Sequence, residues 1–205
     1  MAYGTSASPT TPTTSDGNST ANYTSSLTSL SPQTKYFVRA YATNSEGTGY
    51  GSDVTFYTLS NPPTTGSFAW GTTTGCGNAV LNWTGATFPS SGATTMGYIL
   101  LRSTLGTPSL SNGNGAAPTA SAGTTIVPTG ISSSTTTYTD NPTVNATYNY
   151  VLIPYTWDGT NASTYNYLTG LPMRTVQVYQ IGFANLETQT QSICQGSNIP
   201  DNAIN

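Results

Sequence analysis

The chain carries few side chains that could catalyse a reaction. It has seven acidic residues, four basic residues and no histidine, so no serine or cysteine can be activated by the usual imidazole base. Two carboxylates would suffice to hydrolyse a glycoside, but several of the acids precede a glycine, as in Asp16-Gly17, Glu46-Gly47 and Asp158-Gly159. Acidic residues in that position form turns by bonding to their own backbone. We therefore predict that the protein is not an enzyme and uses no cofactor.

Metal ligands are equally sparse. Residues 16–18 and 158–161 offer loop oxygens for calcium, but without the carboxylate density of a strong site, so a turn is the favoured interpretation. A zinc site would lack ligands, because there is no histidine and no paired cysteine motif. Cys76 and Cys194 stand 118 positions apart. A disulfide between them would stabilise the fold by about 4–5 kcal/mol, and two separate thiols are the simpler alternative.

Aromatic side chains offer a different chemistry, because their faces can stack on sugar rings. The candidates for such a carbohydrate platform are Trp70, Tyr155, Trp157, Tyr165 and Tyr167. The competing interpretation is that these rings pack inside a β-sheet core, where aromatic residues are frequent. Solvent exposure of contiguous rings would favour the platform, and burial would favour the core.

Composition limits both the partners and the fold. Charged residues form 5% of the chain, against about a quarter in a typical domain. Four scattered basic residues make nucleic-acid binding improbable, and no apolar run approaches the ~20 residues of a membrane span. The first residues lack the pattern of a signal peptide, so an export signal is expected outside this chain. The many threonines suit two-sided strands and disfavour helices.

Turn residues recur at the spacing of an antiparallel sandwich. The alternation of apolar and polar residues predicts strands at 35–43, 53–58, 79–83, 97–102, 135–139, 147–155 and 163–168. Prolines at 62 and 63 predict an extended linker over residues 61–66. Residues 104–123 are mostly small and polar, and we expect a long, mobile loop with little to bury.

One segment carries a specific resemblance. Residues 27–47 place Leu30, Pro32 and Tyr36 at the spacing seen where strands E and F meet in fibronectin type III domains. The sequence of residues 41–51 is similar to versions of this segment in surface and secreted proteins of Bacteroidetes-type bacteria. The resemblance implies that Leu30 closes the base of the core, that Pro32 turns the chain, and that the Tyr36 hydroxyl bonds back across the corner.

Residues 79–168 resemble a second copy of the same plan. Trp83 stands where this family has its core tryptophan, and Tyr148 stands where the corner tyrosine belongs, although the Leu-x-Pro signature before it is reduced. The resemblance implies an all-β fold of tandem immunoglobulin-like, fibronectin type III-like antiparallel β-sandwiches. We expect a partial module at residues 1–60, a linker at 61–66, a second module at 67–171 and a tail at 172–205.

Both ends depart from the family pattern. Strands A and B have no counterpart before Tyr3, and the tail begins with strand-like residues, namely Val176, Val178, Tyr179, Ile181 and Phe183. That strand could complete the first module of a neighbouring copy and build a filament, or the chain could be a segment of a multi-module protein. Either way we expect an extracellular, structural or adhesive protein whose partners are other copies of itself or adjoining modules. A carbohydrate-binding or enzyme-accessory module of a secreted protein is the alternative.

Overall fold

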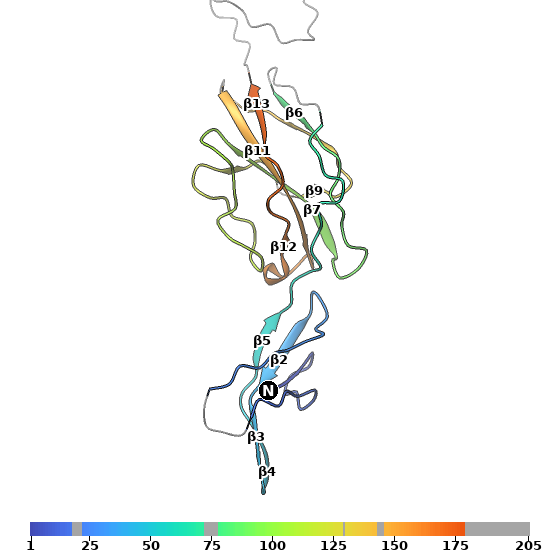
Figure 1. Ribbon diagram of the computed structural model, residues 1–205, viewed down its shortest axis with the longest axis vertical. Helices are drawn as coiled ribbons and strands as arrows, with labels where there is room; N and C mark the ends of the chain where they lie inside the picture. Colours follow the sequence, from blue (N-terminus) through green and yellow to red (C-terminus); the bar gives the residue numbers. More distant parts are fainter. Residues whose placement is uncertain (18–21, 72–77, 129, 143–145, 179–205) are drawn as a thin grey trace, which may run out of the picture.

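The computed structural model describes residues 1–17, 22–71, 78–128, 130–142 and 146–178. Over these residues the protein is all-β, built from antiparallel sheets and one short 3-10 turn, η1 (Ala162–Thr164). The elements form an N-terminal unit, residues 1–59, and a C-terminal unit, residues 64–178, which lie end to end along the long axis (Figure 1). No helix in the described part of the chain is long and apolar enough to cross a membrane.

The N-terminal unit is a single small sheet with a projecting ribbon. Strands β1 (Ala2–Gly4), β2 (Lys35–Arg39) and β5 (Val54–Tyr57) pair in the order β1-β2-β5. The predicted strand at 35–43 is broken at Ala40, whose carbonyl accepts a bond from the Gly51 N–H. Beyond the break, β3 (Tyr41–Asn44) and β4 (Gly47–Tyr50) pair only with each other in the described chain, and they extend away from the sheet as a largely exposed hairpin.

The C-terminal unit contains two sheets. The smaller one pairs β6 (Ala79–Asn82) with β10 (Thr137–Asp140). The larger one consists of β7 (Thr95–Ser103), β8 (Thr125–Ile126), β9 (Ile131–Ser132), β11 (Ala146–Trp157), β12 (Asn166–Tyr167) and β13 (Arg174–Val178). Its centre is the nine-residue ladder between β7 and β11, from Asn149↔Ser103 to Trp157↔Thr95.

The small sheet covers one face of the large sheet. Leu81 from β6 packs with Leu100 from β7 and Leu152 from β11, and all three are fully buried. Trp83 lies in this core, as the resemblance implied, with its ring edge-on to Tyr98. Period-2 alternation explains the arrangement, because successive residues of each strand point to opposite faces of the sheet.

The opposite face of the large sheet is covered by the loop between β7 and β8. Leu110 packs on a second buried cluster that includes Ile99, Leu101 and Ile153. The loop is held by the bridge between Leu110 and Ala120 and by a bond from the Tyr167 hydroxyl to the Ala116 carbonyl, 2.7 Å long. The expectation that residues 104–123 have little to bury is therefore wrong. Pro108 is buried and Leu110 packs on the sheet, together with Ile126, Trp157 and Tyr165.

The last strand of the C-terminal unit is split in two. β12 pairs with the Tyr155 end of β11, and β13 pairs with its Ala146 end. Gly170, at φ +84°, and Pro172, which has no N–H to donate, stand in the connection between them. The predicted strand at 163–168 is thus only η1 and the two residues of β12.

The second part of this strand bears on the expectation for the tail. Val176 and Val178 are buried in the same core cluster as Tyr148 and Tyr150, and β13 pairs with β11 of its own chain. The unit accordingly extends past the expected boundary at 171. The remaining residues of the predicted donated strand, Tyr179, Ile181 and Phe183, lie outside the described residues.

A charged pair joins the two sheets. Arg102 on β7 donates from Nη1 to Asp140 Oδ2 on β10 at 2.7 Å, and the Tyr150 hydroxyl on β11 donates to the same oxygen, also at 2.7 Å. Burial raises the pKa of Tyr150, and the hydrogen bond to Asp140 raises it further. Arg102 also lies 5.3 Å from the centre of the Tyr148 ring. The group connects three strands, β7, β10 and β11.

Candidate functional site

Four of the five rings proposed as a sugar platform do come together. The cross-strand pairing of β11 with β12 places Tyr155 opposite Tyr167, and Trp157 and Tyr165 continue the same face. The Trp157 and Tyr165 rings stack at 4.5 Å and 13°, and the Tyr165 and Tyr167 rings stack at 5.4 Å and 15°. Trp70 does not join them. It packs edge-on against Trp83 in the other core, and its indole N–H bonds to the Pro172 carbonyl.

The geometry of these four rings, which we name the aromatic ladder, disfavours sugar stacking. Tyr165 has one ring face against Trp157 and the other against Tyr167, so neither face is free for a ligand. Tyr155 and Tyr167 are only 6% and 7% exposed. Burial raises the pKa of both hydroxyls, and the Tyr167 hydroxyl is already bonded to the Ala116 carbonyl. The ladder therefore packs β12 and the covering loop onto the sheet.

The N-terminal unit presents an open apolar face. Directly paired residues point to the same side of a sheet, so Tyr3, Val38 and Val54 share a face with Tyr36 and Phe56. Val54 is 65% exposed. Tyr36 and Phe56 are better covered because their rings stack at 5.8 Å and 19°.

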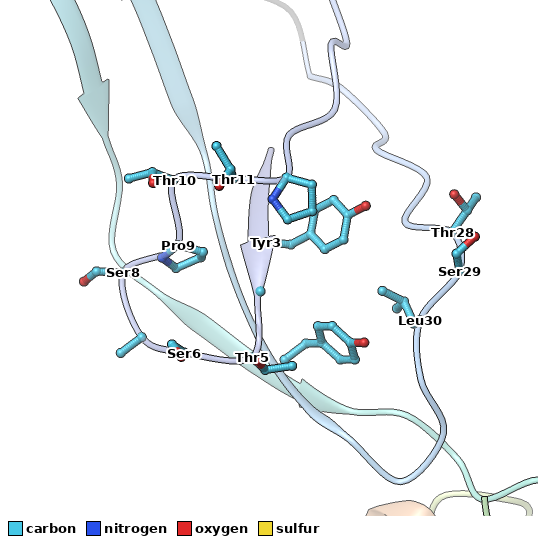
Figure 2. Close-up of a pocket in the computed structure, with 14 residues that line it drawn as sticks. Tyr3, Thr5, Ser6, Ser8, Pro9, Thr10, Thr11, Thr28, Ser29 and Leu30 are labelled. Carbon is cyan, nitrogen blue, oxygen red and sulfur yellow. The ribbon is translucent and has the colours of Figure 1, made fainter.

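A groove of about 600 Å³ opens beside this face, between the chain that follows β1 and residues 28–30. Tyr3 and Leu30 extend toward one another from its two walls (Figure 2). The predicted corner bond is present, because the Ser31 N–H donates to the Tyr36 hydroxyl at 3.0 Å. Leu30 is half-buried at the wall of the groove.

The third feature is the junction between the units, formed by residues 58–64, the turn at 31–34 and the loop at 91–94. Ser60 is 2% exposed. Its N–H donates to the Thr164 carbonyl at 2.9 Å, and its own carbonyl accepts from Asn166 Nδ2 at 2.7 Å. The residue directly before the predicted linker at 61–66 is therefore already bonded into the C-terminal unit.

Asn61 continues these contacts. Its N–H donates to the Gly92 carbonyl at 2.7 Å, its side-chain amide donates to the Ser91 carbonyl at 3.0 Å, and its carbonyl accepts from the Thr156 hydroxyl at 2.7 Å. Three residues further, Thr64 and Thr87 exchange a pair of backbone bonds. Every one of these bonds joins the connecting segment to the C-terminal unit.

Gly92 shows how closely the chains approach at the junction. Its φ is +68°, a conformation that favours glycine. A Cβ at this position would lie 2.6 Å from Pro32 Cγ and would collide with the Asn61 side chain. Pro32, predicted to turn the chain, thus also contacts the C-terminal unit.

Two of the acidic residues, Asp158 and Asp16, accept hydrogen bonds from nearby residues of the chain. Asp158 Oδ1 accepts the N–H groups of Thr160 and Asn161 at 2.8 and 2.6 Å, and these bonds lower the pKa of Asp158 against the opposing effect of its partial burial. Asp16 accepts from the hydroxyls of Ser25 and Thr14, which lowers its pKa. No group of three His, Cys, Asp or Glu residues that could hold a metal occurs within the described ranges. Cys76 and Cys194 both lie outside those ranges.

Compared with protein families, with curated proteins and with solved structures, the chain has no significant match to any of them. Function must therefore be argued from the three features above: the aromatic ladder, the open face and the junction.

Proposed function

We propose that this protein is a non-enzymatic, extracellular structural protein in which a partial and a nearly whole fibronectin type III-like, immunoglobulin-like sandwich module form a stiff connector. Its partners would be adjoining modules of the same protein or further copies of it. The all-β architecture, the corner bond at Tyr36 and the core position of Trp83 support the choice of module. The low charge and the resemblance of residues 27–47 to modules of bacterial surface proteins support the location.

The observation that carries the proposal is the bonded junction. Relative motion of two domains is the ordinary expectation when a linker makes few contacts. Here Ser60 and Asn61 bond through backbone and side chain to the segments at 91–92, 156 and 164–166. A connection of this kind fixes the separation of the units. That is the requirement of a spacer, and a catalyst or a hinge does not need it.

The experiment measures whether the two units tumble together. In ¹⁵N relaxation of the wild-type chain, we expect one rotational correlation time for amides of both units. In Gly92→Ala, the added Cβ collides with Asn61 and Pro32 and separates the units, so the N-terminal unit should acquire a shorter correlation time.

Gly170→Ala is the matched control. Gly170 also has a positive φ, +84°, but nothing lies within 4 Å of its added Cβ, and it is remote from the junction. The control should tumble as the wild type does. Two independent correlation times in the wild-type chain would overturn the stiff-connector proposal.

A further inference from the structure

Gln33 has a backbone conformation that its residue type does not favour. It lies in the turn at residues 32–33 with φ +52°. Glycine is the usual residue at a turn position with positive φ, because it has no Cβ to crowd the backbone, and asparagine is tolerated because its side chain bonds locally. A strained residue persists only when its surroundings hold it in place, and strain of this kind points to a role for the side chain.

The side chain of Gln33 spans the junction. Its Nε2 donates to Ser60 Oγ at 2.9 Å, and its Oε1 accepts from the Thr94 hydroxyl at 3.1 Å. Ser60 belongs to the connecting segment, and Thr94 belongs to the loop that leads into β7 of the C-terminal unit. The Gln33 N–H also donates to the Leu59 carbonyl at 3.2 Å. One residue of the N-terminal unit thus contacts both the connecting segment and the unit beyond it.

These contacts differ in kind from those of Ser60 and Asn61. The bonds of Ser60 and Asn61 tie the connecting segment to the C-terminal unit, and they would survive if the N-terminal unit rotated about residue 59. The bond between Gln33 and Thr94 would not survive such a rotation, because it joins the body of one unit directly to the body of the other.

We infer that Gln33 is an orientation lock, which fixes the rotation of the N-terminal unit relative to the C-terminal unit and keeps a strained backbone for that purpose. The inference rests on the proposed stiff-connector function, and it assigns the fixed angle between the two units to one side chain. For the Gln33→Gly variant, it predicts loss of the common orientation of the units without loss of thermal stability in the N-terminal unit. Replacement of Gln33 by glycine relieves the backbone strain in the turn and at the same time allows the two units to rotate relative to each other.

The test uses residual dipolar couplings of the full chain in a dilute aligned medium. One alignment tensor should fit both units of the wild type. In Gln33→Gly we expect loss of the common tensor, with no fall in the thermal midpoint of the N-terminal unit, because the strained φ becomes an ordinary one. Thr94→Val removes the hydroxyl that bonds to Gln33 and should also lose the common tensor.

Ser29→Gly is the matched control. Ser29 lies four positions before Gln33 with the same kind of backbone, φ +56°, and it is exposed and outside the junction. This variant should keep one tensor. If Gln33→Gly also keeps one tensor, the orientation lock is wrong while the stiff connector stands. If Ser29→Gly loses the common tensor as well, the turn backbone and not the glutamine amide sets the angle, and the inference is again wrong. Two tensors in the wild type would overturn the stiff connector itself.

Discussion

In the C-terminal unit both faces of the large sheet are covered, one by the β6–β10 sheet and the other by the loop at 104–124. In the N-terminal unit the three-stranded sheet carries an open face on which Val54 is 65% exposed. The N-terminal strands have three to five residues, whereas β7 and β11 of the C-terminal unit pair over nine. The difference teaches that alternating strands provide a sheet, while stability depends on whether a second layer covers it.

The largest expected effect contrasts two leucines, one from each unit. Leu100→Ala removes a fully buried side chain from the closed core and should lower the free energy of unfolding by about 2–5 kcal/mol. Tryptophan fluorescence in a urea titration measures it, because Trp70, Trp83 and Trp157 all lie in the C-terminal unit.

The companion variant Leu30→Ala alters the half-buried wall of the groove in the N-terminal unit. We expect a cost below about 1.5 kcal/mol there, since less area leaves water on folding. Hydrogen exchange of the N-terminal amides measures this cost. Equal costs for the two leucines would contradict the comparison between a closed and an open unit.

Next in size is the charged group between the two sheets. Asp140→Ala leaves the Tyr150 hydroxyl buried without its acceptor and removes the partner of Arg102. Loss of a buried pair costs about 3–5 kcal/mol. Because the Arg102 side chain is 22% exposed and can still reach water, we expect about 2–4 kcal/mol. Urea unfolding followed by fluorescence gives the value, and a change below about 0.5 kcal/mol, the range of surface substitutions, would show that the group adds nothing.

Two valines, one buried and one exposed, test the same contrast between the closed and the open unit, with a smaller expected change in stability. Val178→Ala, at 0% exposed, should cost about 1–2 kcal/mol, and Val54→Ala, at 65% exposed, should stay within about 0.5 kcal/mol. The first variant also tests whether β13 contributes to its own unit. Thermal unfolding of both variants measures these costs. If Val178→Ala leaves the stability unchanged, the result would favour the hypothesis that this strand pairs with another copy of the chain.

Alkaline pH should weaken the closed unit through Tyr150. Burial raises the pKa of its hydroxyl, so the stabilisation is complete below the unfolded value near 10 and is lost as the pH rises above it. At pH 11 this single group should cost about 1 kcal/mol. Tyr150→Phe should be less stable than the wild type at pH 8 and should lose less stability between pH 8 and 11. An identical pH slope in the two proteins would exclude Tyr150 as the cause.

Several of these features follow from the sequence, and others do not. The strand patterns located β6, β7, β10 and β11 to within a few residues, and the continuous apolar runs of β7 and β11 fit strands that are buried on both faces. The resemblance of residues 27–47 implied a bond at the Tyr36 hydroxyl, and the structure supplies its partner, the Ser31 N–H. Four rings of the aromatic ladder come from two adjacent segments, so the sequence also indicated that they could meet.

The covering loop was missed because it is held to the sheet by partners far away in the sequence, such as the Tyr165 carbonyl for the Gly115 N–H and the Tyr167 hydroxyl for the Ala116 carbonyl, which composition does not reveal. The bond between Arg102 and Asp140 depends on how two sheets stack, and the Gln33 conformation depends on a partner 61 positions away. Such long-range placements are set by packing. The local sequence pattern determines strands and turns, but it does not determine how they pack against one another.

The split between β12 and β13 has a mechanical consequence. Tension between the N-terminal unit and the chain after Val178 would enter the C-terminal unit at Ser60, beside β12, and leave at the far end of β13. Because β13 runs along β11 away from the junction, such a pull would slide one strand past the other and load all the rungs of the ladder at once, from Arg174 to Val178. Strands loaded in shear break together rather than one bond at a time, and the resistance to force depends on the barrier to unfolding.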